Sequence, residues 1–217
     1  MLNVSRPWSI AIALLCLSLS YSTARAQALP ETALQHHLSR VDLGVTAVGQ
    51  LTGDVAGQNY LKQNITLRAS KTVGFLATLR YIKSPLVGLE ANYMQARYTE
   101  NFSNIVGGVQ TKASEYSLGY VVHAPSFFGF KPYAAVGAGS TAFRPTAGGG
   151  QGLSAQARMT YYYNVGLDDD ALISKHFGVR VHMRQAFYKA PDFGQNYLTI
   201  QKHTSTLEPG IGFYLRF

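Results

Sequence analysis

A strict alternation within the last fifteen residues, His203 to Phe217, limits the possible folds of this chain more than any other pattern in it. Counting back from the end, every second residue is apolar, and most residues between them are polar, charged or glycine. Because successive side chains of a strand point to opposite faces, this period of two predicts a β-strand with one apolar face. The apolar set is Phe217, Leu215, Phe213, Ile211, Pro209 and Leu207.

The other end of the chain predicts export. Residues 1–26 carry the basic Arg6, a short apolar run and an A-x-A motif at residues 24–26, which is the pattern of a cleaved signal peptide. We expect residues 27–39 to form a flexible periplasmic leader. The only cysteine, Cys16, would leave with the signal, so disulfides and thiol chemistry are excluded from the exported chain.

The same alternation recurs along the rest of the chain and predicts eight strands in all. A charged content of 14%, with 14 Tyr and 11 Phe, also suits sheets better than helices. We expect the second strand to follow Asn64 and to run unbroken to Ile82. Long and short connections alternate, as in transmembrane barrels with extracellular loops and periplasmic turns. The long ones are residues 50–64, 99–111, a stretch around Gly148–Gly150 and 189–202, and the short ones are 83–85, 125–130 and 168–170.

The two faces of the predicted strands differ in chemistry. Charged residues recur on one face, whereas Tyr, Phe, Val and Leu occupy the other. A soluble barrel of the lipocalin type is the alternative, but a transmembrane barrel suits this pattern better. It places the charges in a polar interior and the apolar face in lipid, and closure pairs every backbone group. We therefore predict an all-β fold, an eight-stranded antiparallel up-and-down transmembrane β-barrel, over residues 40–217.

The signal peptide, the alternating strands and the terminal Phe217 together resemble small bacterial outer-membrane barrels of the OmpA/OmpX type. The local stretches most similar to that family are Phe177 to Arg184 and Gly210 to Phe217. The resemblance implies an outer-membrane location, contact with outer-membrane lipids and lipopolysaccharide, and insertion by the barrel-assembly machinery, as a monomer. It implies that Phe213, Leu215 and Phe217 form the assembly signal. Since the sequence ends with the predicted barrel, no peptidoglycan-binding domain is carried over.

A polar barrel interior needs its charges to be paired, because a lone buried charge costs several kcal/mol. We expect two tiers of ion pairs in the lumen, with Arg184 and Glu208 on neighbouring strands. The tier near the periplasm would hold Asp42, Arg80, Glu90 and Arg216, the higher tier would hold Glu115, Arg158, Arg184 and Glu208, and Arg180 also faces the lumen.

Evidence for chemistry is weak. His203-Thr204-Ser205 has the His-x-Ser spacing of outer-membrane lipid A deacylases, but Thr206 replaces the asparagine that follows the serine there, and the motif lies on the last strand. We interpret the run Asp168–Asp170 as a solvated periplasmic turn and not as a calcium site. No catalytic residue, cofactor or metal site is predicted. The net charge of +8 is spread along the chain, so nucleic acid is not expected as a partner.

Three functions remain compatible with the sequence. The first is a non-enzymatic barrel with an envelope-structural or surface-interaction role through four extracellular loops. The second is a narrow channel for ions or small solutes, although eight strands leave an interior that side chains fill. The third is a hydrolase that modifies lipid A.

Overall fold

The computed structural model describes residues 32–146, 152–169 and 176–217. The predicted signal peptide, Gly148–Gly150 and Asp170 lie outside the described residues. The chain divides into two units, residues 1–36 and residues 37–217. A short helix, α2 (Ala33–Leu38), lies within the predicted leader. No helix in the described part of the chain is long and apolar enough to cross a membrane.

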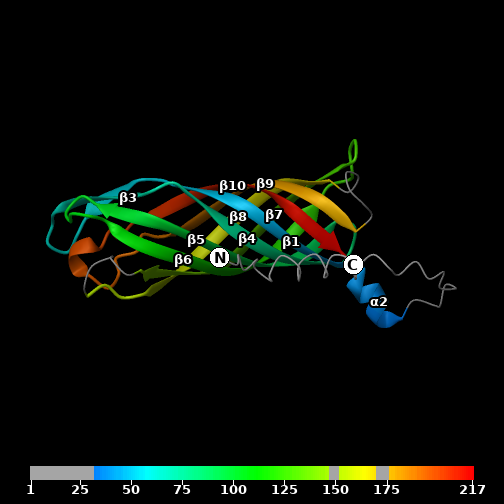
Figure 1. The fold of residues 1–217 in the computed structure, drawn as a ribbon, viewed down its shortest axis with the longest axis horizontal. Coiled ribbons are helices and arrows are strands. Elements are labelled where there is room, and N and C mark those ends of the chain that lie inside the picture. The colour runs from blue at the N-terminus through cyan, green and yellow to red at the C-terminus, as the bar shows by residue number, and fades with distance from the viewer. Residues whose placement is uncertain (1–31, 147–151, 170–175) are drawn as a thin grey trace, which may run out of the picture. The chain divides into compact units, whose positions relative to one another are not determined.

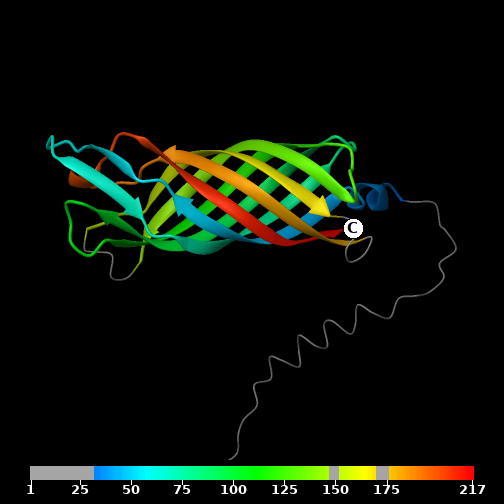
Figure 2. The ribbon, with the colours of Figure 1, turned by 90° about the horizontal axis from the view of Figure 1, so that it is seen from above.

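Eight antiparallel strands of the second unit close into a barrel (Figures 1 and 2). Each strand pairs with the next along the barrel wall, and β1 pairs with the last strand to complete the circle. The predicted fold class, an all-β up-and-down barrel, is confirmed. The barrel strands are β1 (Val41–Thr52), β4 (Thr72–Ile82), β5 (Val87–Phe102), β6 (Val109–His123), β7 (Phe130–Pro145), β8 (Gln156–Asp169), β9 (Phe177–Lys189) and β10 (His203–Arg216).

The first long connection contains a hairpin that was not expected from the sequence. Its strands are β2 (Val55–Gln58) and β3 (Asn64–Ala69), and β3 pairs with the far end of β5. The predicted unbroken second strand is therefore wrong at its start, because β4 begins only at Thr72. β5 continues to Phe102, so its end offers a free edge where β3 can satisfy its backbone hydrogen bonds. The predicted loop 99–111 shrinks accordingly. We call this end of the barrel the cap end, and the end with connections 83–86 and 124–129 the turn end.

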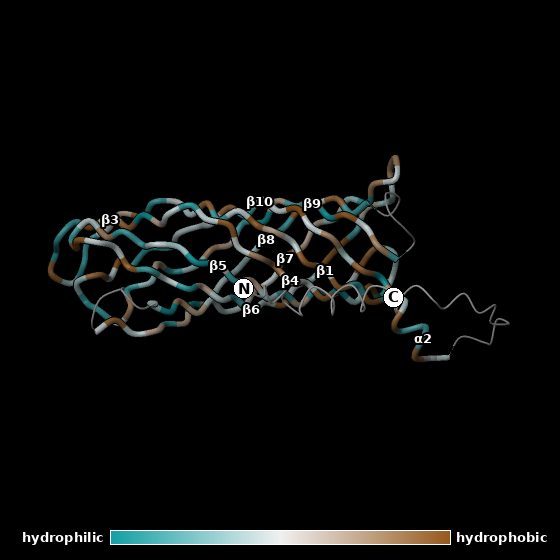
Figure 3. The backbone as a smooth tube through the Cα atoms, viewed as in Figure 1, coloured by the Kyte–Doolittle hydropathy of each residue, from teal (hydrophilic) through white to brown (hydrophobic). Residues whose placement is uncertain are grey.

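Burial alternates along the barrel strands as predicted. On β1, Leu43 and Val45 face outward, whereas Asp42 and Thr46 are buried inside. Outward side chains elsewhere are large and apolar, and Val73 and Leu118 are each 71% exposed. The alternating hydropathy along the strands can be followed in Figure 3. The predicted facing is confirmed, and the outer wall carries the apolar surface that a lipid environment requires.

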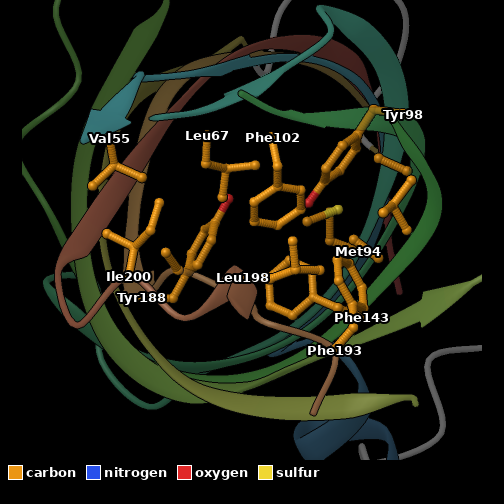
Figure 4. Close-up of a cluster of buried hydrophobic side chains, with 14 of the residues drawn as sticks. Val55, Leu67, Met94, Tyr98, Phe102, Phe143, Tyr188, Phe193, Leu198 and Ile200 are labelled. Carbon is orange, nitrogen blue, oxygen red and sulfur yellow. The ribbon is translucent and has the colours of Figure 1, made fainter. Parts of the chain in front are cut away.

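The barrel interior has a polar part and an apolar part. Charged and hydroxyl side chains fill the interior toward the turn end. Near the cap end, apolar side chains converge inside the barrel (Figure 4). Part of this cluster comes from the connection between β9 and β10, which contains the short 3-10 helix η1 (Asn196–Leu198). The members labelled in Figure 4 are Val55, Leu67, Met94, Tyr98, Phe102, Phe143, Tyr188, Phe193, Leu198 and Ile200.

Candidate functional site

Two ion-pair networks occupy the lumen. The one nearer the turn end, which we call the lower network, is centred on Asp168 of β8. Its carboxylate accepts from Nε and Nη2 of Arg180 at 2.7 and 3.0 Å, and from Nη1 of Arg80 at 3.4 Å. Nε of Arg80 also donates to Glu90 at 2.9 Å, and Nη2 of Arg180 donates to Asp42 at 3.3 Å. All five side chains are at most 2% exposed. Two arginines and three carboxylates thus share one buried network, in which every charge has a partner.

The Arg80–Asp168 contact joins opposite walls of the barrel. Following the strand order, β8 lies four strands from β4 in either direction around an eight-stranded circle. Tyr133 on β7 lies beside both arginines, with its ring centroid 4.0 Å from the Arg80 guanidinium and 5.6 Å from that of Arg180. The ring face attracts both cations and helps to hold them in the centre. The lumen is therefore crossed by side chains at this level.

A second network, which lies nearer the cap end and which we call the upper network, surrounds Arg184 on β9. Its two terminal nitrogens donate to Glu208 and to Glu115, and all three side chains are at most 1% exposed. The Arg184 guanidinium also lies 4.3 Å from the centroid of the Tyr162 ring. The Tyr162 hydroxyl donates to Glu90 at 2.8 Å, which connects the upper network to the lower one. In this network one arginine therefore serves two carboxylates.

The predicted lumen residues divide between the two networks, with two exceptions. Arg158 reaches the connection after β9, where it pairs with Asp192 at 3.0 Å. Arg216 is half-buried, with its guanidinium 5.5 Å from the centroid of the Tyr214 ring. The lower network contains Asp42, Arg80, Glu90 and Arg180, and the upper one contains Glu115, Arg184 and Glu208.

The interpretation of Asp168 and Asp169 as a solvated turn is wrong. Both residues belong to β8 and both are buried, and Asp168 is the centre of the lower network. The signal was present in the sequence, because Asp168 continues the inward-facing set of Thr160, Tyr162 and Asn164 at a period of two. The two facing arginines make the interior position favourable, which the Asp run alone does not show.

The cap end is held together by hydrogen bonds between its connections. Asn59 and Asn104, from two different connections, both donate to the backbone carbonyl of Tyr197, at 3.1 and 2.7 Å. Gln156 at the start of β8 accepts from the backbone N–H of Phe193 at 3.0 Å. Phe193 in turn packs against Phe102, with ring centroids 6.3 Å apart. These residues join the connections that contain Asn59, Asn104 and Phe193 into one assembly, which we call the cap.

The cap contains one unusual carboxyl group. Glu100 on β5 is 2% exposed, points into the apolar cluster with Tyr98 and Phe102, and its Oε2 has no hydrogen-bond partner in the described part of the chain. Burial in these apolar surroundings raises the pKa of the Glu100 carboxyl well above its ordinary value. The sequence did not single out Glu100. Its neighbours along the chain do not show whether an inward-facing carboxylate lies among charged side chains in the lumen or among apolar ones in the cap.

The remaining predicted residues lie on the outer face of β10 or directly after its end. Phe213 and Phe217 are exposed there, and Phe213 stacks on Phe177 with ring centroids 5.3 Å apart. Leu215 is also exposed. Their role in assembly stays a prediction. His203 and Ser205 lie at the cap end of the same strand, with His203 exposed and Ser205 half-buried.

Comparison with solved structures gives the fold class. The outer membrane protein OprG from Pseudomonas aeruginosa matches with a TM-score of 0.61 and 15% identity, over 82% of this chain and 95% of that chain. Neisserial surface protein A matches with a TM-score of 0.57 and 11% identity, over 82% of this chain and 97% of that chain. No protein-family model and no curated protein matches the sequence.

At these identities the likeness shows the fold. The chain has the fold of a small eight-stranded barrel of the bacterial outer membrane, as the sequence predicted. The apolar outer wall agrees with a location in that membrane.

Proposed function

We propose that the protein is a non-enzymatic outer-membrane barrel that acts through its ordered extracellular cap, in an envelope-structural or surface-interaction role. The observation that carries this proposal is the contact between Arg80 and Asp168 across the full width of the barrel. A lumen crossed by a buried ion pair and then filled by an apolar cluster offers a poor path for ions or solutes.

The cap supports the surface role. Two of its connections donate hydrogen bonds to the Tyr197 carbonyl of a third, so this part of the outward surface is preorganised and a partner needs to order little of it on binding. Apolar side chains are exposed on this surface, and Tyr60, Leu61 and Val106 are 61%, 65% and 105% exposed. Tyr60 and Leu61 are adjacent in the turn between β2 and β3, and large apolar side chains left exposed together are typical of interaction surfaces.

A narrow channel is the second candidate, and one observation favours it. Several buried polar atoms between the two networks or beside the upper one have no hydrogen-bond partner in the part of the chain that the structure describes. They include Ser117 Oγ, Asn164 Oδ1 and both ring nitrogens of His182. Such groups in proteins are normally satisfied by water, so this part of the interior suits hydration.

Conductance in a planar bilayer separates the two candidates. We expect no discrete current steps from the wild type, because both the ion pairs and the apolar cluster obstruct the lumen. The double variant Arg80→Ala/Asp168→Ala, combined with replacement of residues 191–201 by a short Gly-Ser linker, should conduct. Steady single-channel currents from the wild type would establish the channel instead. An enzyme would reveal itself by a changed lipid A mass after incubation with the wild type and not with Ser205→Ala.

A further inference from the structure

Three cations lie side by side on the outer wall of the barrel. Arg97 on β5 pairs in register with Lys112 on β6, and Lys112 pairs with Arg144 on β7. All three side chains point outward, with Arg97 and Arg144 exposed and Lys112 half-buried. None of them forms a salt bridge with another described residue. Like charges directly opposite each other destabilise a sheet. An anion bound to this row would offset the repulsion among the three cations.

The row lies at the height of the lipid headgroups on the cap side. On the outward face of β5, the apolar band begins at Val87, and Arg97 follows after 97 − 87 = 10 residues. At about 3.3 Å per residue and a strand tilt of about 40°, that distance is roughly 25 Å of height, which is the usual height of the apolar band. The same tilt makes the row climb by roughly 6 Å from β5 to β7, which fits within a headgroup layer.

A groove of about 430 Å³ lies below this row on the same three strands. Its outward-facing lining pairs Ala91 with Leu118 and Ala138 in one row, and Tyr116 with Ser140 in the row above. The groove is hollow because Ala91, Ala138 and Ser140 are small, whereas Leu118 and Tyr116 project beside them. Only one further row of residues separates the groove from the cations. A ligand with an anionic head and an apolar chain could occupy both at once.

We propose that this face of β5, β6 and β7 binds a phosphorylated glycolipid of the outer leaflet, with its phosphates on Arg97, Lys112 and Arg144. One acyl chain then lies in the groove beneath. Phosphate is the headgroup chemistry that Arg and Lys bind best, since guanidinium and ammonium groups donate charge-assisted hydrogen bonds to its oxygens. A second copy of the protein docked by the same face would bring cation against cation, so charge complementarity favours the lipid. The site is independent of whether the lumen conducts.

The test uses the full chain, refolded in neutral detergent micelles, and native mass spectrometry to follow binding of bisphosphorylated lipid A. The first variant is Arg97→Gln/Lys112→Gln/Arg144→Gln. Its matched control is Lys62→Gln/Lys83→Gln/Lys202→Gln, which removes three cations from other parts of the chain. A third variant, Ala138→Phe, fills the groove. Folding of each protein is checked by its unboiled mobility in electrophoresis.

We expect the first variant to bind lipid A roughly tenfold more weakly or worse, since each basic residue near a membrane surface contributes to attraction of anionic lipid. The control should stay within about twofold of wild type, and Ala138→Phe should weaken binding without changing its dependence on salt. Wild type should bind the same lipid with its phosphates removed as weakly as the first variant binds lipid A. Equal binding by the first variant and its control, or equal binding of the two lipids by wild type, would overturn the proposal.

Discussion

Replacing Arg184 by methionine should be the most destabilising single change in the lumen. Arg184 donates to both Glu115 and Glu208, and all three side chains are buried. Removing one partner of a buried ion pair costs about 3–5 kcal/mol, because the remaining charge is left without compensation. Here two carboxylates lose their partner together, so we expect a loss of unfolding free energy at or above the upper end of that range.

Two further variants calibrate this expectation. Glu208→Gln leaves Arg184 paired with Glu115, so it should cost only about 1.5–3 kcal/mol, the scale of one hydrogen bond to a charged group. The sequence named only Glu208 as a neighbour of Arg184, and the structure shows that Glu115 accepts from the same guanidinium. The triple variant Arg184→Met/Glu115→Leu/Glu208→Leu replaces the network by apolar groups and should lie close to wild type.

The assay is urea unfolding and refolding in detergent micelles at pH 7, followed by far-ultraviolet circular dichroism and by electrophoretic mobility. Arg184→Met should have the lowest midpoint, Glu208→Gln an intermediate one and the triple variant the highest of the three. Two results would refute the reasoning. One is Arg184→Met with wild-type stability, and the other is additivity of the Arg184 and Glu208 substitutions within about 0.5 kcal/mol, which would mean that the two sites are not coupled.

Three further predictions concern the cap, the outer wall and the last strand. Wild type should lose unfolding free energy as the pH rises above 4.5, by at most about 1.4 kcal/mol per pH unit. The reason is that the buried Glu100 carboxyl keeps its proton in the folded state, whereas it ionises in the unfolded state. In urea titrations at several pH values this slope should vanish in Glu100→Gln, and an unchanged slope would contradict the prediction. Val181→Arg places a charge in the middle of the apolar wall and should lower the unfolding free energy of the barrel in a bilayer by about 2–4 kcal/mol. Gln95→Arg, near the boundary of the apolar band, should lower it by at most about 1 kcal/mol. Equal losses would contradict the heights assigned to these two residues. Removing Phe217 should lower insertion in cells while the purified protein still refolds in micelles, and equal surface levels would argue against an assembly role.

Two of the differences between the expected and the observed structure share one physical origin. The hairpin of β2 and β3 depends on an edge that exists only because β5 continues past β4, and no local pattern encodes that edge. Arg158 was assigned to the lumen by its alternation, and it does face inward, but a connection folded over the barrel supplies its partner, Asp192. Both differences concern residues that meet only after the connections have taken their places, whereas Asp168 meets its two arginines inside the strand-built lumen.

Local patterns in the sequence were enough to predict the number of barrel strands and the face of each strand that meets lipid. That information is local, because the two-residue period follows from strand geometry and the contrast between lipid and lumen repeats in every strand. Which charges meet, how the cap fills the barrel mouth, and that Arg97, Lys112 and Arg144 share one row could be read only from the folded barrel. Those facts depend on the register between strands, and a shift of two residues preserves every facing while changing every partner.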